Sequence, residues 1–170
     1  MSEMTSCIVI YNNPAELSAA VRSLRQDGFD MSHVSVVGKG GQADDLVGMS
    51  CIDGRPDFYG EQRIFWNKLW TNLEGAALFW APDYGVIAAA GFIVTWMARG
   101  LDELHFNGGF GPLGSALYSL AVPRGSIPYY EKSIRSARIL LVAHGGRHEV
   151  EQAGQMLGQG RNVEMAVHAA

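Results

Sequence analysis

Two short segments of this 170-residue chain are hydrophobic at every position: CIVIY at residues 7–11 and ILLVA at residues 139–143. Alternate side chains of a β-strand point to opposite faces of its sheet. Each large apolar side chain left in water would forfeit roughly 1.5–3 kcal/mol, so a strand with no polar face needs cover on both sides. We expect both segments to be central strands of a sheet that is covered on both faces.

Signals for a helix and a second strand follow the first segment. Asn13 suits the N-cap of a helix, Pro14 suits its first turn, and Glu16 supplies the acid expected three positions after the cap. Gly28 suits the position just beyond the end of the helix. The apolar residues of this helix share one face: Leu17, Ala20, Val21 and Leu24. HVSVVGKG, residues 33–40, is expected to form the second strand.

The second hydrophobic segment is also followed by signals for a helix and a further strand. A helix is expected at about residues 147–157, and VEMAVHA at residues 163–169 alternates as a half-exposed strand does. Without the long middle of the chain, the order strand, helix, strand, strand, helix, strand is the ferredoxin-like plan. The first and third strands of that plan are central, which agrees with the two fully hydrophobic segments.

We therefore predict an α+β fold, a four-stranded antiparallel ferredoxin-like sheet with a long hydrophobic helical insert between strands 2 and 3. The single domain spans residues 1–170, with the insert at about residues 41–125 and the core formed by residues 5–40 and 126–170. Two helices can cover only one face of such a sheet. The insert or a second subunit is expected to cover the other face.

Within the insert, a polar connection is expected at residues 41–57. A helix is expected from about Gly60 until Pro82 and Asp83 interrupt it. Large apolar residues recur along it at helical spacing: Trp66, Leu69, Trp70, Leu73 and Trp80. This stripe is interpreted either as core packing or as an interface anchor, because tryptophan is frequent at binding hot spots and at membrane interfaces.

The run YGVIAAAGFIVTWMA, residues 84–98, carries no charged side chain. Its fifteen residues are fewer than the roughly 18–20 that a transmembrane helix needs. We expect it to belong to a helical hairpin buried in protein; the alternatives are a segment at the lipid interface and a true membrane span. A last helix is expected from Ser126 to Arg138, with an apolar face made of Tyr130, Ile134 and Ala137.

Composition and charge exclude several classes of function. Hydrophobic residues make up 48% of the chain and charged residues 18%, and the net charge is −4. Lys and Arg form no basic stripe, which argues against nucleic-acid binding. The N-terminus has no secretory pattern, and Cys7 and Cys51 form no metal-binding spacing. We expect a cytoplasmic protein with reduced cysteines; the alternative is a peripheral position at the inner membrane.

Four stretches carry a resemblance to a known family: CIVIYNNPAELSAAVRSL, HVSVVGKG, EGAALFWAPDYGVIAAAGFIVTWMARGL and GFGPLGSALYSLAVPRGSIPYYEKSIRSARILLVAHG. They are similar to the bacterial general stress protein family with a glycine-rich hydrophobic insert. The resemblance covers most of the chain. It implies a ferredoxin-like core, a hydrophobic helical insert and a stress-linked, non-enzymatic role, and it brings no catalytic residues.

The motif HGGRH offers a candidate anion or ligand site. His144 and His148 flank Gly145 and Gly146, whose backbone N–H groups near a helix start suit an anion. The alternative is a strand end, a turn and a surface histidine, and two imidazoles without a third ligand make a poor metal site. We predict no catalytic residue, no metal site and no cofactor.

Three functions are compatible with these features. The favoured one is a non-enzymatic, stress-linked assembly or interaction protein that forms a homo-oligomer through Trp66, Leu69, Trp70, Leu73 and Trp80. The second is a membrane-peripheral protein whose insert helices contact lipid. The third is a sensor that binds a small ligand, of unknown identity, in a cleft between the sheet and the insert.

Overall fold

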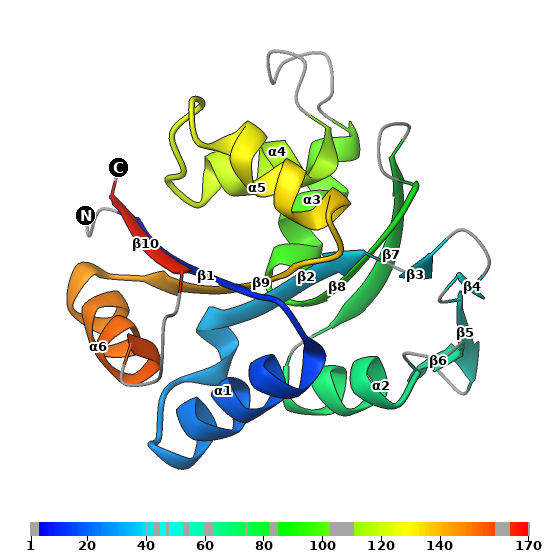
Figure 1. The fold of residues 1–170 in the computed structure, drawn as a ribbon, viewed down its shortest axis with the longest axis horizontal. Helices are drawn as coiled ribbons and strands as arrows, with labels where there is room; N and C mark the ends of the chain where they lie inside the picture. Colours follow the sequence, from blue (N-terminus) through cyan, green and yellow to red (C-terminus); the bar gives the residue numbers. More distant parts are fainter. Residues whose placement is uncertain are drawn as a thin grey trace.

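An antiparallel sheet of six strands, in the order β10-β1-β9-β2-β8-β7, forms the centre of the molecule (Figure 1). The computed structural model describes residues 4–39, 41–42, 45–46, 48–52, 55–59, 63–73, 75–81, 85–102, 111–158 and 164–169. The strands of the large sheet are β1 (Thr5–Tyr11), β2 (Val34–Lys39), β7 (Ala76–Ala81), β8 (Gly85–Gly91), β9 (Ile139–Gly145) and β10 (Glu164–Ala169). Two small sheets pair β3 (Gly41–Gln42) with β4 (Asp45–Leu46) and β5 (Gly48–Ile52) with β6 (Arg55–Tyr59).

Helices cover both faces of the large sheet, so the predicted α+β class is confirmed (Figure 1). One face carries α1 (Pro14–Gln26), α2 (Arg63–Asn72) and α6 (Arg147–Gly158). The other face carries α3 (Ile93–Asp102), α4 (Pro112–Ser119) and α5 (Ile127–Arg135). A short 3-10 helix, η1 (Met31–His33), leads into β2. The sheet has six strands where four were expected.

The prediction that both faces of the central strands need cover is confirmed. Cys7 and Val9 of β1 belong to the core cluster under α1, α2 and α6. Ile8 and Ile10 belong to a second cluster, which contains Met97 of α3 and residues of α4 and α5. The middle of the chain, together with α5, therefore closes the second face without a second subunit.

The first helix begins and ends as predicted. Oδ1 of Asn13 accepts a hydrogen bond from the backbone N–H of Glu16 at 2.9 Å, and Pro14 occupies the first turn. Gly28 follows the helix with φ +80°, a conformation that favours glycine. The buried residues of the helix are Leu17, Val21 and Leu24.

The prediction of a helical insert is wrong in part, because the insert contains strands β3 to β8 beside helices α2, α3 and α4. α2 ends at Asn72, and Trp80, which was expected on the same helix, lies on β7. The uncharged run is half strand and half helix, because β8 ends at Gly91 and α3 begins at Ile93. β8 pairs with β2 on one side and with β7 on the other. A short apolar run satisfies a buried strand as well as a buried helix, and only the partners decide.

Small side chains explain why β8 fits inside the sheet. Ala88, Ala89 and Ala90 are completely buried. Ala88 and Ala90 face the cluster that contains Trp66. The indole of Trp66 also lies against Gly38 of β2, where a Cβ atom would stand 3.2 Å from its Cζ2 atom. Alanine and glycine on the strands thus leave space for the largest side chain of that cluster.

Three smaller expectations also need correction. In the four-stranded plan, whose first and third strands are central, the second strand is an edge strand, but β8 makes it an interior strand. Residues 41–57 include strands β3 to β5 and part of β6, where a connection was expected. α5 ends at Arg135, and Ala137, expected on its apolar face, is exposed with φ +64°. Among the described residues, every helix is too short or too polar to cross a membrane.

Candidate functional site

Three polar residues meet at one end of the large sheet. His144 lies near the end of β9 and pairs with Ser6 of β1. Ala143, one position earlier, pairs with Val34, the first residue of β2. His33, which precedes β2, is therefore brought beside His144, and their ring centroids lie 5.4 Å apart. Strand pairing across more than a hundred residues thus creates a polar row in a hydrophobic protein.

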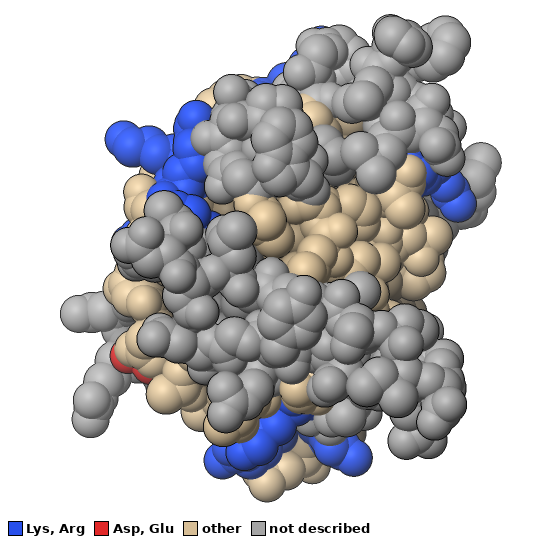
Figure 2. Space-filling view, turned by 90° about the vertical axis from the view of Figure 1, so that its right-hand side faces the viewer, with Lys and Arg blue, Asp and Glu red and all other residues tan. Residues whose placement is uncertain are grey.

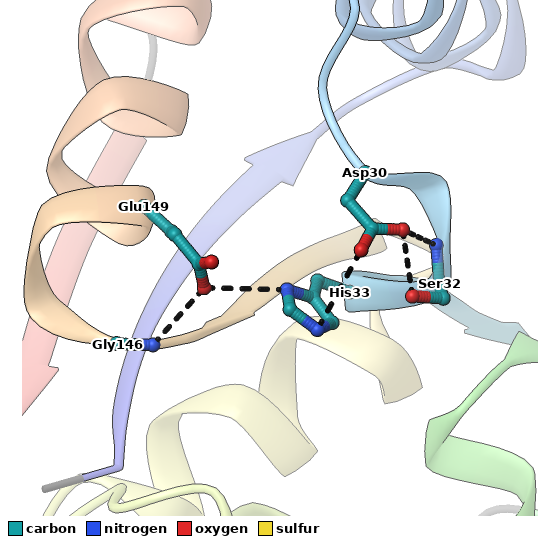
Figure 3. Close-up of polar contacts among 5 residues, drawn as sticks. All are labelled: Asp30, Ser32, His33, Gly146 and Glu149. Atoms are coloured by element: carbon teal, nitrogen blue, oxygen red, sulfur yellow. Dashed lines mark hydrogen bonds and ion pairs between the residues drawn. The ribbon is translucent and has the colours of Figure 1, made fainter. Parts of the chain in front are cut away.

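His33 lies between two carboxylates (Figure 3). Its Nδ1 atom is 3.4 Å from Oε2 of Glu149, and its Nε2 atom is 3.9 Å from Oδ2 of Asp30. Asp30 also accepts hydrogen bonds from Ser32, at 2.7 Å from the hydroxyl and 3.0 Å from the backbone N–H. These bonds from Ser32, more than the neighbouring histidines, lower the pKa of Asp30. The contact of His33 with Glu149 anchors η1 to the start of α6.

His144 has the opposite surroundings. Its side chain is 5% exposed, and its ring lies among those of His33, Phe92 and Trp96, the last two with centroids at 5.3 and 6.5 Å. Burial first, and the neighbouring His33 second, lower its pKa to about 4, so the ring is neutral at pH 7. Its Nδ1 atom and the hydroxyl of Ser6 are buried without a hydrogen-bond partner among the described residues.

The structure separates the members of the predicted anion site. The N–H of Gly146 donates to Oε2 of Glu149 at 3.3 Å, so a carboxylate of the chain itself takes the place expected for an anion. Gly145 has φ +142°, and a Cβ atom there would stand 2.6 Å from the same oxygen. His148 is exposed and lines a different surface depression, together with Glu151, Gln152 and Gln155. Ligand binding at HGGRH stays a prediction.

The described part of the chain contains neither a reactive thiol nor a candidate metal site. Cys7 is completely buried, and burial raises its pKa to about 11, which keeps the thiol protonated and unreactive. The described residues contain no group of three His, Cys, Asp or Glu side chains that could hold a metal ion. Cys51 belongs to β5, and its side chain lies outside the described part.

A second candidate region is a pocket between α5 and the edge strand β10. Its volume is about 380 Å³. The pocket is lined by Ile8, Ile10, Gly125, Ser126, Tyr129, Tyr130, Glu164, Met165, Ala166 and His168. It therefore lies against the terminal strands and α5, and not in a cleft formed by the insert.

Polar contacts close two sides of this pocket. The hydroxyl of Tyr130 and Nε2 of His168 lie 2.7 Å apart. Burial raises the pKa of Tyr130 to about 12 and lowers the pKa of His168, so both groups are neutral at pH 7. Glu164 forms an ion pair with Arg138 at 3.1 Å, which ties β10 to the residue before β9. The region can recognise a mostly apolar molecule with one hydrogen-bonding group.

β10 is also an open edge strand of the sheet. Among the described residues no strand pairs with its outer side. Met165 and Val167 are 39% and 51% exposed on the face shared with α6, whereas every residue of β1 is buried. Among the described residues six large hydrophobic side chains are exposed, and three of them, Tyr129, Met165 and Val167, lie at this edge.

The opposite side of the molecule, where the large sheet ends at β7, carries its charged side chains in a different arrangement from the β10 edge. Figure 2 shows described Lys and Arg side chains around its rim and, between them, described surface without acidic or basic side chains. β5 contacts β7 there.

The predicted interaction stripe divides between the core and the part that is not described. Trp66, Leu69 and Leu73 are 1%, 3% and 5% exposed and belong to the core cluster of the chain. The side chains of Trp70 and Trp80 lie outside the described part. The core-packing interpretation of the stripe therefore applies to its three described members. Contact of these five residues with a partner stays a prediction.

Sequence patterns did not single out Asp30, His33, Glu149, Tyr130 or His168 as parts of a site. No local motif joins them, because each group forms by pairing of distant segments. The alternation of residues 163–169 did contain the signal for an exposed edge. No protein-family model, no curated protein and no solved structure matches this chain.

Proposed function

We propose that the protein is a non-enzymatic, stress-linked interaction protein that self-associates in the cytoplasm. The stress link comes from the resemblance of the sequence to bacterial general stress proteins. We also propose that residues 5–39 and 126–169 form a ferredoxin-like unit that β7 and β8 extend. The order β10-β1-β9-β2, with α1 and α6 on one face, supports this unit.

The observation that carries the proposal is the edge formed by β10. Both faces of the sheet are covered within one chain, so a partner is not needed to bury the core. Backbone groups at a free sheet edge and exposed hydrophobic side chains beside it are the features that proteins use to pair with another chain. Met165 and Val167 supply those side chains on β10.

Size-exclusion chromatography with light scattering, without detergent and over a wide concentration range, tests self-association. We expect one defined species of at least twice the 18.4 kDa chain mass. A mass of 18.4 kDa at every concentration would contradict the proposal. Co-sedimentation with lipid vesicles, or a need for detergent, would instead support the membrane-peripheral alternative, in which the insert contacts lipid.

The pocket between α5 and β10 favours a second candidate function, binding of a small molecule. Its lining combines apolar Ile8 and Ile10 with Tyr130 and His168. A panel of small aromatic and aliphatic alcohols and acids should contain a compound that raises the melting temperature with concentration. Ser126→Leu, which narrows the pocket, should abolish that shift. If no compound shifts the wild type, this candidate is discarded.

A further inference from the structure

β10 has a side-chain pattern that is complementary to itself. Met165 and Val167 project on the α6 face of the sheet, because they pair with Val9 and Cys7 of β1. Glu164 and His168 project on the α5 face, where they line the pocket. Ala166 lies at the centre of these four residues. The strand therefore places an acid and an imidazole on one face and two apolar side chains on the other.

We propose that the edge of β10 pairs antiparallel with β10 of a second copy of this chain, around a twofold axis at Ala166. This inference rests on the proposed self-association and identifies its interface. The two six-stranded sheets would form one continuous sheet, with α5 and α6 of each copy beside those of the other. An isologous contact of this kind closes as a dimer.

The register follows from the period of the strand. Residues opposite one another in an antiparallel pair share a face, so the axis must lie midway between the two copies of one residue of the strand. With the axis at Ala166, Met165 packs against Val167 of the second copy, and Glu164 faces His168 of the second copy. Each contact occurs twice. With the axis at Met165 or Val167, Glu164 and His168 no longer meet.

Contacts within the chain are compatible with this register. Glu164 bonds Arg138 through Oε2, and His168 contacts Tyr130 through Nε2. A carboxylate has a second oxygen and an imidazole a second nitrogen. Each group can therefore keep its partner within the chain and meet the other across the interface, where protonation of the histidine turns a hydrogen bond into an ion pair.

Two variants at the axis test the interface. In Ala166→Lys two ammonium groups lie directly opposite each other, and lysine at an edge opposes strand pairing. We expect the dissociation constant of the dimer to rise about tenfold or more, by light scattering and analytical ultracentrifugation. Ala19→Lys, at an exposed site on α1, is the matched control and should self-associate as the wild type does.

Ala166→Cys tests the register itself. Opposite Cα atoms lie about 4.5–5.5 Å apart, within the range of a disulfide. Mild oxidation should therefore cross-link this variant efficiently. Met165→Cys should not cross-link, because its two copies lie more than about 7 Å apart in this register. The wild type controls for Cys7 and Cys51, and circular dichroism verifies folding.

The outcomes separate the two proposals. A monomeric wild type overturns both self-association and this interface. An oligomeric wild type overturns only the interface if Ala166→Lys keeps its mass and Ala166→Cys does not cross-link. Cross-linking of Met165→Cys in preference to Ala166→Cys would overturn the register. If Ala166→Lys does not fold, the two cysteine variants decide.

Discussion

β8 and β10 flank the same three strands, β1, β9 and β2, yet they have opposite characters. β8 has a strand on each side, and Ala88, Ala89 and Ala90 at its centre are completely buried. In the described part of the chain β10 has a strand on one side only, and none of its residues is fully buried. The two strands show that position in the sheet, more than length or hydrophobicity, sets which side chains a strand can carry.

The insert is what creates this difference. In a four-stranded sheet β2 and β10 would both be edges. By adding β8 and β7 next to β2, the insert converts that edge into an interior and leaves β10 open. An interior strand between α2 and α3 needs small, uncharged side chains, whereas an edge strand can carry polar side chains such as Glu164 and His168. The four predictions below test this contrast.

The largest effect is expected at the end of β8. Gly91 has φ +100°, and a Cβ atom there would collide with the carbonyl oxygen of Val34 in β2. Gly91→Val should therefore lower the free energy of unfolding by about 3 kcal/mol or more, since backbone and not a flexible side chain must move. Urea unfolding measures the loss. Gly125→Ala, with open space at its Cβ, should change stability by less than about 1 kcal/mol and is the control.

The next effect concerns an interior histidine. The pKa of His144 is lowered from 6.5 to about 4, so the unfolded chain binds its proton first as the pH falls. The neutral ring therefore makes its full contribution to the free energy of unfolding above pH 6.5. This contribution decreases as the pH falls towards 4, by about 3 kcal/mol in total. Between pH 6.5 and pH 4, the free energy of unfolding of His144→Leu should therefore decrease by about 3 kcal/mol less than that of the wild type. Urea unfolding at several pH values measures the difference. An unchanged pH profile would show that His144 is not buried in its neutral form.

A matched pair of alanines compares the two strands directly. Ala89 is completely buried in β8, and Ala169 is exposed at the end of β10. Ala89→Leu should destabilise the fold by about 1–3 kcal/mol through overpacking, whereas Ala169→Leu should change it by less than about 0.5 kcal/mol. Thermal and urea unfolding measure both. Equal losses would contradict the interior position of β8.

The smallest effect is expected at the edge. Arg138 and Glu164 form an ion pair between side chains that are 33% and 41% exposed. Arg138→Gln should lower stability by at most about 1 kcal/mol, because solvent screens such pairs. Added salt should reduce the difference between this variant and the wild type. A larger, salt-independent loss would mean that β10 depends on this contact more than exposure suggests.

Local chemistry made the ends of the chain predictable. Asn13 and Gly28 act through neighbours in sequence, so the start and end of α1 could be read directly. The fully hydrophobic segments at residues 7–11 and 139–143 specified central strands because periodicity alone shows that neither strand has a polar face. The alternation at residues 163–169 indicated an exposed strand for the same reason.

The middle of the chain was not predictable in this way. Trp66 and Trp80 fit one helical stripe, but Trp80 lies on a strand because β8 offers the segment a partner. No sequence pattern indicated the polar row of His33, His144 and Ser6 either. These residues lie near the ends of β2, β9 and β1, which are distant in sequence. The candidate site at β10 was visible only as an alternating pattern, without its pocket.

The amino-acid sequence by itself determined that a sheet with two fully hydrophobic strands must be covered on both faces, since burial of apolar surface depends only on side-chain type and period. The tertiary structure alone decided what supplies the cover and which strand remains an edge. Those outcomes depend on pairing between distant segments. A buried run of alanine, glycine and isoleucine can form either a helix or a strand, and its partners decide between them.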